Sequence, residues 1–140
     1  MSLKQIIELK LFLLNSISLI KDSIMFLLVY CPSDIVIGDV LHYNSTSQLW
    51  ERATTIDHPL CVARTNAEVR GDGFAVEGIF AGPCLAKASR SIPVQGGELQ
   101  VENGAVYVDN SANGPGIICP QIIDNSDPRN AGDLVQVVVR

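Results

Sequence analysis

The chain has few residues of the kinds that build catalytic or metal centres. It holds two histidines in 140 residues, so a histidine-rich metal site cannot be assembled. Its four cysteines include no Cys-x-x-Cys pair, which argues against a zinc knuckle or a thioredoxin-type redox site. Asp57 and His58 offer residue types for acid-base chemistry, but no Gly-x-Ser-x-Gly nucleophile elbow accompanies them. We therefore expect no enzyme and no cofactor.

Positive charge is scarce over most of the chain. From Asp34 to the C-terminus there are thirteen Asp and Glu residues against seven Lys and Arg residues. Nucleic-acid binding needs clustered basic side chains that displace counterions from phosphates, whereas Lys87 and six arginines are scattered here. We expect no nucleic-acid partner. The 47% hydrophobic and 18% charged content is that of a folded chain, and its length suits one domain with a real core.

Residues 1–33 carry much of the apolar excess and predict a helical arm. A capping-box pattern opens the segment, and Pro32 would end the helix. Apolar residues recur at helical spacing, namely Leu3, Ile6, Ile7, Leu11, Leu14, Ile17 and Ile20. We expect Ile6, Leu14 and Ile17 to lie in an interface that this arm makes with its own domain or with a neighbouring subunit.

A membrane span or a secretory signal in the same segment stays open as an alternative. A span needs about 20 mostly apolar residues with few charges. The charged residues that divide this segment are Lys4, Glu8, Lys10, Lys21 and Asp22. Val29-Tyr30-Cys31 is not the small-x-small sequence that signal cleavage prefers. The alternative function is a membrane-anchored or exported β-domain that binds a carbohydrate or a protein. A shorter chain that begins at Met25 would lack residues 1–24 of this segment.

After Pro32 the sequence predicts short strands separated by turn residues, and hence a mainly β fold. The expected strands are 36–43, 49–52, 60–64, 74–80, 84–88, 98–101, 105–108, 116–123 and 134–139. Asn103-Gly104 is the strongest local signal, because this dipeptide readily takes the positive φ angles of a type I′ turn. Residues 99–101 and 106–108 should therefore pair as a hairpin.

Two parts of this β region, about 35–80 and 92–140, resemble each other. The matched positions are 35–41 with 93–99, Trp50 with Val108, Cys61 with Cys119, and Gly71-Asp72 with Gly132-Asp133. The first three matches are 58 positions apart and the last is 61 apart. Two copies are too few for a solenoid. We expect residues 34–140 to form one small β-barrel or sandwich from two related β units, with the helical arm attached.

Two sets of residues each have two interpretations. Cys61 and Cys119 are expected to be buried thiols in a reducing compartment, and a disulfide between them across the barrel is the alternative. Asp39, Asp72 and Asp133 each follow a glycine at the start of a strand, which raises a calcium hypothesis. Hydrogen bonds from nearby backbone groups in turns explain these aspartates at least as well. We expect no bound metal.

Two places are candidate interfaces between protein chains. Trp50 is the only tryptophan, and it belongs either to the core or to a subunit interface. The strand at 134–139 would present an unpaired edge if it lay on the outside, so Leu134, Val135 and Val137 are interface candidates as well.

A series of short motifs runs in order along residues 34–140. They are Gly38-Asp39-Val40-Leu41, Ala53, Pro59-Leu60-Cys61-Val62-Ala63, Phe74-Ala75-Val76-Glu77-Gly78, the stretch 92–99, and Ala131-Gly132-Asp133-Leu134-Val135-Gln136-Val137. In this order they resemble the tailed-phage capsid cement or decoration proteins, some of which have been mislabelled as recombinases. The individual motifs consist of common turn residues, so the resemblance depends on their order.

The resemblance implies a structural role without catalysis. Members of that family are small β-rich proteins that bind the outside of an expanded icosahedral head, usually as trimers at three-fold positions. It implies that this chain is a homotrimer, made in the host cytoplasm, that binds the major capsid protein on the outer capsid surface of the virion. There it would stabilise the capsid by bridging neighbouring subunits. Residues 1–33 depart from the family pattern, which leaves open a capsid-gripping arm, an inter-subunit helix or another role.

Overall fold

The computed structural model describes residues 24–54, 59–110, 116–120 and 129–140, and within these ranges the chain forms strands and no helix. The strands are β1 (Met25–Cys31), β2 (Val40–Asn44), β3 (Leu49–Arg52), β4 (Leu60–Ala63), β5 (Glu68–Arg70), β6 (Gly73–Lys87), β7 (Gly97–Glu102), β8 (Ala105–Val108), β9 (Ile117–Cys119) and β10 (Leu134–Val139). The predicted mainly β class is confirmed. The expected strands at 49–52, 105–108 and 134–139 have the predicted bounds.

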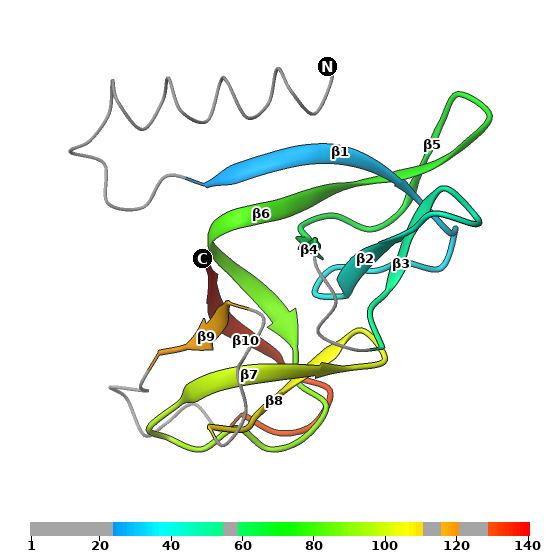
Figure 1. Ribbon diagram of the computed structural model, residues 1–140. Coiled ribbons are helices and arrows are strands. Elements are labelled where there is room, and N and C mark those ends of the chain that lie inside the picture. The colour runs from blue at the N-terminus through cyan, green and yellow to red at the C-terminus, as the bar shows by residue number, and fades with distance from the viewer. Residues whose placement is uncertain (1–23, 55–58, 111–115, 121–128) are drawn as a thin grey trace, which may run out of the picture.

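The strands form one sheet in the order β3-β2-β4-β6-β10-β9-β7-β8, and β1 and β5 also pair with β6. The pairings between these strands are antiparallel. The path begins at β3 and ends at β8, so the sheet is open rather than the closed barrel that was one of the expected forms. Figure 1 shows β1 to β5 on one side of the molecule, β7 to β10 on the other, and β6 running through both groups.

The 15-residue strand β6 replaces the two separate strands expected at 74–80 and 84–88. Its first part pairs with β1, β4 and β5, and its last six residues, 82–87, pair with β10. Gly82 has a φ angle of 107°, which an L side chain rarely adopts, and Pro83 follows it. This Gly-Pro pair therefore bends the strand sharply without ending it (Figure 1).

The expected helical arm over residues 1–33 is wrong at its C-terminal end. Met25–Cys31 is a strand that pairs with β6 over all seven of its residues. A short apolar run fits a buried helix and a buried strand equally well, and here the neighbouring strand decides. Pro32 therefore ends a strand and not a helix. Residues 1–23, with Ile6, Leu14 and Ile17, lie outside the described residues, so the rest of the arm stays a prediction.

Local turn signals explain the other boundaries. Leu99 pairs with Val108, and Asn103 and Gly104 have φ angles of 47° and 79°, which confirms the predicted hairpin and its turn. The strand expected from residue 36 starts instead at Val40, because residues 36–39 form a turn in which the amide of Asp39 bonds to the carbonyl of Val36. The short strand β5, which pairs back onto β6 at the tip of the sheet, was missed.

The two halves of the sheet have the same strand arrangement when each is followed inward from its outer edge. Replacing β2, β3, β4 and β6 by β7, β8, β9 and β10 turns the run β3-β2-β4-β6 into β8-β7-β9-β10. A duplicated β unit would produce this arrangement, and the duplication itself stays a hypothesis.

The strand register corrects two of the matched positions. Tyr43 pairs with Trp50, and Val101, 58 positions after Tyr43, pairs with Val106. If the two units are duplicates, the register therefore makes Val106, rather than Val108, the counterpart of Trp50. Cys61 pairs with Leu41, whose matched position is Leu99. Cys119, however, pairs with Gly97, two positions before Leu99. The two cysteines thus lie in equivalent strands at positions two residues apart, since the second hairpin loop is shorter.

The core consists of two apolar clusters, of which the larger joins the halves. The larger cluster is shared, because it combines Val40 and Val62 of the first group with Leu99, Ile117 and Val137 of the second. The smaller cluster lies within the first group and includes Val29, Leu41, Cys61 and Val76. Strands β2 and β4 contribute to both clusters, because their alternate side chains face opposite sides of the sheet. Joint burial of the first cluster makes the two halves one folding unit.

Candidate functional site

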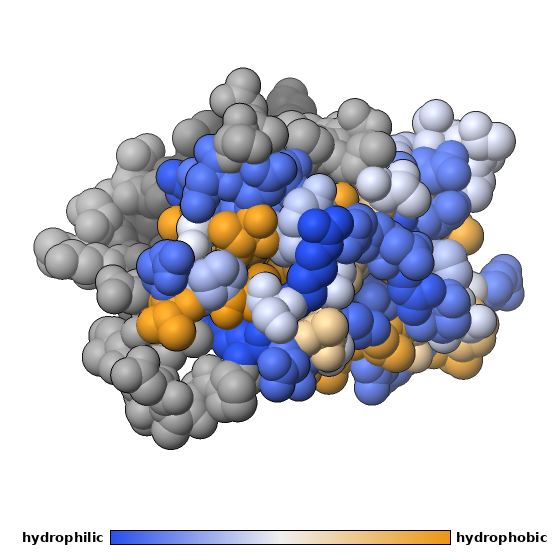
Figure 2. All heavy atoms as spheres, turned by 90° about the horizontal axis from the view of Figure 1, so that it is seen from below, coloured by the Kyte–Doolittle hydropathy of each residue, from blue (hydrophilic) through white to orange (hydrophobic). Residues whose placement is uncertain are grey.

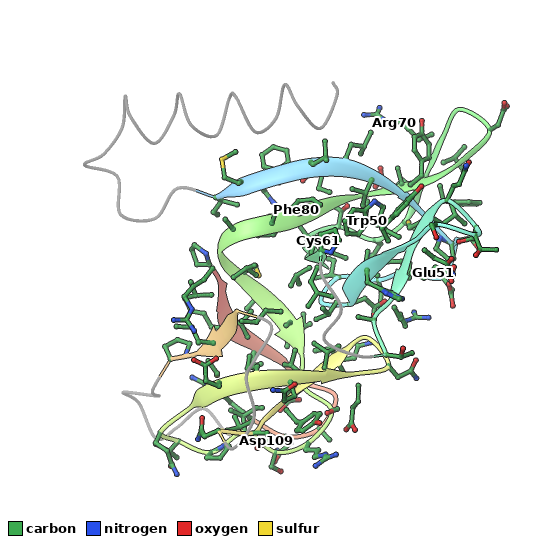
Figure 3. The ribbon with its side chains drawn as sticks, in the orientation of Figure 1. Trp50, Glu51, Cys61, Arg70, Phe80 and Asp109 are labelled. Carbon is green, nitrogen blue, oxygen red and sulfur yellow. The ribbon has the colours of Figure 1, made fainter. Side chains whose placement is uncertain are left out.

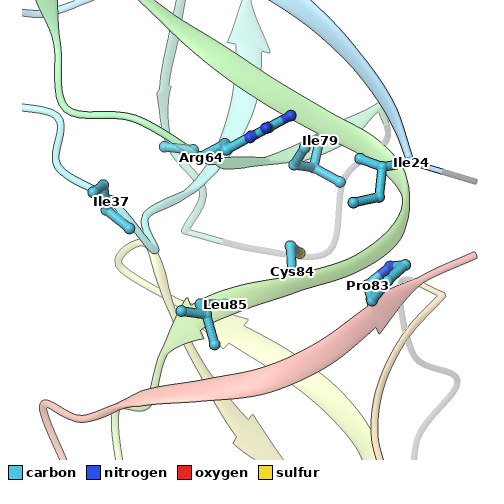
Figure 4. A pocket seen from close by; sticks show the side chains of 8 residues that line it. Ile24, Ile37, Arg64, Ile79, Pro83, Cys84 and Leu85 are labelled. Carbon is cyan, nitrogen blue, oxygen red and sulfur yellow. The ribbon is translucent and has the colours of Figure 1, made fainter. Parts of the chain in front are cut away.

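The bend of β6 creates an apolar pocket on the outside of the sheet. Its volume is about 230 Å³. The lining residues are Ile24, Ile37, Ala63, Arg64, Ile79, Pro83, Cys84 and Leu85. Figure 4 shows Ile24 and Ile79 on one side of the bend, with Pro83, Cys84 and Leu85 on the other. The pocket brings together residues that are distant in sequence, because β6 turns back toward the start of β1 and toward the turn before β2.

Large apolar side chains remain exposed beside this pocket. Ile37 and Leu85 are 37% and 47% exposed. Leu134 is 45% exposed, and its side chain lies against Gly38, the neighbour of Ile37. Together with Pro83, these three residues form a surface that we call the bend surface. Contiguous exposed apolar groups of this kind commonly mark contact sites between proteins.

The charged groups near the pocket are paired with one another. The Arg64 guanidinium lies 3.6 Å from a carboxylate oxygen of Glu77 and 5.1 Å from the centre of the Phe26 ring. Both side chains of this ion pair are partly solvent-exposed, so the pair contributes little to stability. It forms a polar edge to the apolar pocket, as is common around protein contact surfaces.

A buried carboxylate stands at the junction between the two groups of strands. Asp39 is 1% exposed and accepts a hydrogen bond from the amide of Val36 at 2.9 Å. Its two oxygens also lie 3.1 Å from the Arg52 guanidinium and 3.5 Å from the Lys87 ammonium. Arg52 belongs to β3 and Lys87 ends β6. This aspartate therefore joins three segments of the chain and has a structural role.

The three aspartates of the calcium hypothesis do not come together. Asp133 accepts the amide of Asn130 at 2.9 Å, the same turn contact that Asp39 makes with Val36. Asp72 is exposed at the tip between β5 and β6. Among the described residues no group of three or more His, Cys, Asp or Glu side chains is placed to hold a metal ion. Turn chemistry accounts for Asp39 and Asp133. Asp57 and His58 lie outside the described residues.

Trp50 packs inside the first group of strands. Its ring meets Phe80 edge to face with 5.2 Å between the ring centres, and the centre of the Tyr43 ring lies 5.8 Å away. Figure 3 shows Trp50 and Phe80 next to Cys61, and these side chains border the smaller core cluster. The core explanation thus accounts for most of this side chain. A subunit contact through its partly exposed remainder stays a prediction.

The candidates on β10 divide between the two faces of the sheet. Val135 and Val137 are 2% and 0% exposed and belong to the larger core cluster, whereas Leu134 points outward. The strand pairs with β6 over all six of its residues and with β9 at Val138 and Val139, so its C-terminal end is not an outer edge. Of these three residues, Leu134 has the side chain that is available to a partner. The interface assignment itself stays a prediction.

The face on the side of β7 and β8 is largely polar where it is described. In Figure 2, which shows the molecule from this side, hydrophilic residues cover most of the coloured surface and hydrophobic ones gather in smaller areas. Arg90 pairs with Glu102 at 3.0 Å and stacks over the Tyr107 ring at 4.1 Å. Arg140 pairs with Glu98 at 2.8 Å. Here the oppositely charged side chains are paired with each other, as on an ordinary hydrated face.

The arrangement of the strands has a counterpart among solved structures. The fold is similar to that of the head fiber gp8.5 N base of bacteriophage phi29. The two chains align with a TM-score of 0.59 and 13% sequence identity, over 84% of this chain and 95% of the phage protein. No protein-family model and no curated protein sequence matches this chain. At this identity the likeness shows a shared fold.

Two further findings bear on the alternatives left open by the sequence. All four cysteines are free thiols, so Cys61 and Cys119 form no disulfide here. In the part of the chain that the structure describes, no helix has the length and apolar content needed to cross a membrane.

Thiol labelling should report the burial of Cys84 in the pocket wall. Burial raises the pKa of this thiol from 9.0 to about 12, so its reactive thiolate is scarce in the native protein. At about pH 8 we expect native Cys84 to react with a disulfide reagent at least about tenfold more slowly than the same thiol in urea, because the scarcity of thiolate outweighs its higher nucleophilicity. Peptide mapping after timed labelling measures this rate. Fast labelling of native Cys84 would contradict the placement of its side chain.

The same shifts predict a loss of stability in alkaline solution. Burial also raises the pKa of Cys31, to about 11, with a smaller contribution from Asp34. Because the unfolded thiols ionise near 9.0 and the native ones at a higher pH, their stabilising contribution is complete below pH 9. It declines as the pH rises from there toward the native pKa values. Urea unfolding at neutral pH and at about pH 10 should show the lower midpoint at the higher pH. Replacing Cys31 and Cys84 by alanine should reduce this difference.

Proposed function

We propose that this chain is a structural virion protein that binds the outer surface of a phage capsid and stabilises it by bridging major capsid subunits. In this role it acts as a homotrimer, carries out no catalysis and contacts no nucleic acid. The observation that carries the proposal is the fold likeness to the phage head fiber base, which extends over 95% of that protein. The motif order along residues 34–140, which resembles the capsid decoration proteins, points the same way.

The bend surface is the part of the molecule that we assign to the capsid. It is apolar, exposed and bordered by the Arg64–Glu77 ion pair. It is built on the bend of β6, where antiparallel pairing with β10 holds Leu85 and Leu134 in place. A rigid surface loses little conformational entropy on binding. When several subunits of one oligomer bind together, contacts that are weak singly become durable.

Cosedimentation with heads tests the proposal. The probe is expanded, empty heads of the source phage, prepared without this protein. We expect the protein to sediment with these heads and to raise the temperature at which they disrupt. Replacing Leu134 by aspartate should lower the affinity about tenfold or more, because a charge would be buried in an apolar contact. Val69→Asp is the matched control, since Val69 is 73% exposed on β5 at the far tip of the sheet.

Two results would count against these statements in different ways. If the native protein fails to bind expanded heads, the proposed function is wrong. If it binds and Leu134→Asp binds equally well, the function stands and the bend surface is the wrong assignment. The mass of the protein in solution, measured by sedimentation equilibrium, tests the trimer separately.

A further inference from the structure

The composition of β1 is that of a strand with both faces buried. The described residues, however, cover only one of its two faces. Its sequence Met-Phe-Leu-Leu-Val-Tyr-Cys contains no charged residue. Strands with one face in water usually alternate apolar and polar residues, and continuous apolar runs are typical of strands buried on both sides. Val29 and Cys31 face the smaller core cluster. The residues that alternate with these along the strand point outward and are apolar as well.

These outward residues form a stripe along β1. Ile24, Phe26, Leu28 and Tyr30 are 42%, 51%, 39% and 50% exposed. They occupy alternate positions, so their side chains share one face of the strand. On the neighbouring strand, Glu77 pairs with Leu28 and forms the ion pair with Arg64, which gives the stripe a polar border. We call these four residues the β1 stripe.

The chain itself supplies an apolar segment directly next to this stripe. Twenty-three residues precede Ile24, the residue at which the β1 stripe begins and which also lines the pocket. Their apolar side chains recur at helical spacing from Leu3 onward, so they predict a second apolar face that needs a partner. The predicted helix face precedes Ile24 in the chain, and the β1 stripe begins at this residue. The two surfaces can meet with little loss of chain entropy, because the connection between them is short.

The lengths of the two surfaces agree. From Ile24 to Tyr30 a strand spans about 20 Å. As a helix, residues 3–14 would span about 18 Å. Residues 15–23 then remain to reverse the direction of the chain, and Asn15, Ser16 and Ser18 in that stretch favour turns over helix.

From these observations we propose that residues 3–14 pack, within the same subunit, as an amphipathic helix on the β1 stripe. The contact would place Ile6, Leu14 and their apolar neighbours against Phe26, Leu28 and Tyr30. It would cover the outer face of the sheet along β1 and leave the bend surface open. Residues 1–23 would then be a structural part of the subunit rather than an arm reaching to a neighbour or a membrane. This inference does not depend on the proposed function.

Amide hydrogen exchange of the full-length protein tests this contact. We expect amides of residues 3–14 to exchange at least about tenfold more slowly than in a synthetic peptide of the same sequence. The double substitution Phe26→Ser and Tyr30→Ser should return them to the rate of the peptide. A matched control is Val69→Ser with Val94→Ser, because these side chains are 73% and 47% exposed and lie outside the stripe. The control should leave the exchange of residues 3–14 unchanged.

A second variant covers the case in which the stripe substitutions unfold β1. Ile6→Asp with Leu14→Asp changes the segment and leaves the sheet intact, and it should also abolish the slow exchange. The proposal is overturned if residues 3–14 of the native protein exchange at the peptide rate. It is equally overturned if dilution lowers the mass of the protein in solution and abolishes the slow exchange at the same time. That result would mean that a second copy of the chain covers the β1 stripe. Protection that appears only with phosphatidylglycerol vesicles would assign the segment to a membrane and overturn it too.

Discussion

Replacing Asp39 by asparagine is expected to lower the free energy of unfolding by about 2–3 kcal/mol. The substitution keeps the size of the side chain and removes its charge. Arg52 and Lys87 then lose the carboxylate that they share at the junction of β3 and β6. Both cations are about one-third exposed, so water compensates part of the loss, and we place the effect below that of a fully buried pair. Urea unfolding, followed by circular dichroism, measures the change.

Asp133 provides a matched control for this substitution. It ends a turn of the same form, with its carboxylate accepting the amide of Asn130 and a glycine of positive φ before it. Asp133 is exposed, and no ion pair of its carboxylate is found among the described residues. Asp133→Asn should therefore cost about 0.5 kcal/mol or less. Because asparagine can still accept the turn amide through its Oδ1 atom, equal losses for the two variants would show that the ion pairs at the junction do not stabilise the fold.

The comparison of these two aspartates also shows what sequence reasoning can and cannot deliver. Both were recognised as Gly-Asp turns from local residue types, because the signal lies within four residues. The ion pairs of Asp39 were not foreseen, since Arg52 and Lys87 are 13 and 48 positions away. Turn chemistry is local, whereas the environment of a charge is set by which strands meet.

The strands divide in the same way. The hairpin at Asn103-Gly104 and the strand Leu134–Val139 were predicted in detail, because a turn dipeptide and a valine-rich run directly after a Gly-Asp turn are strong local signals. Strand β1 was mistaken for part of a helix, since its apolar run carries no period that separates the two. β6 was divided in two, because Gly82-Pro83 usually marks a turn. In both cases pairing with a distant strand decided the structure.

The sequence pointed to β10 as a candidate contact strand but not to the pocket beside it. Whether β10 makes a contact stays a prediction, and alternation along the strand means that Leu134 faces outward while Val135 and Val137 face the core. The pocket beside it joins Ile24, Ile37 and Leu85, which no spacing in the sequence relates. The bend in β6 is the physical cause of this juxtaposition.

Replacing Gly96 by alanine is expected to cost about 3 kcal/mol or more of unfolding free energy. A Cβ atom at this position would overlap the carbonyl oxygen of Cys119 and lie 2.8 Å from that of Pro120. Both obstacles are backbone atoms, so neither can rotate away as a side chain would. The φ angle of Gly96 is 66°, which adds the strain of a left-handed conformation, about 1–2 kcal/mol for an L residue. The close approach of β9 to the start of β7 thus depends on this glycine.

Gly71→Ala separates the two contributions. Gly71 has a φ angle of 61°, close to that of Gly96, and nothing lies within 4 Å of the Cβ that a substitution would add. This variant should lose about 1–2 kcal/mol, from the backbone conformation alone. The difference between the two variants then measures the steric overlap with β9. Since Leu99 and Ile117 on these two strands belong to the shared core cluster, a displaced β9 should also weaken the joining of the halves. A Gly96→Ala protein as stable as Gly71→Ala would mean that β9 and β7 are further apart than the structure shows.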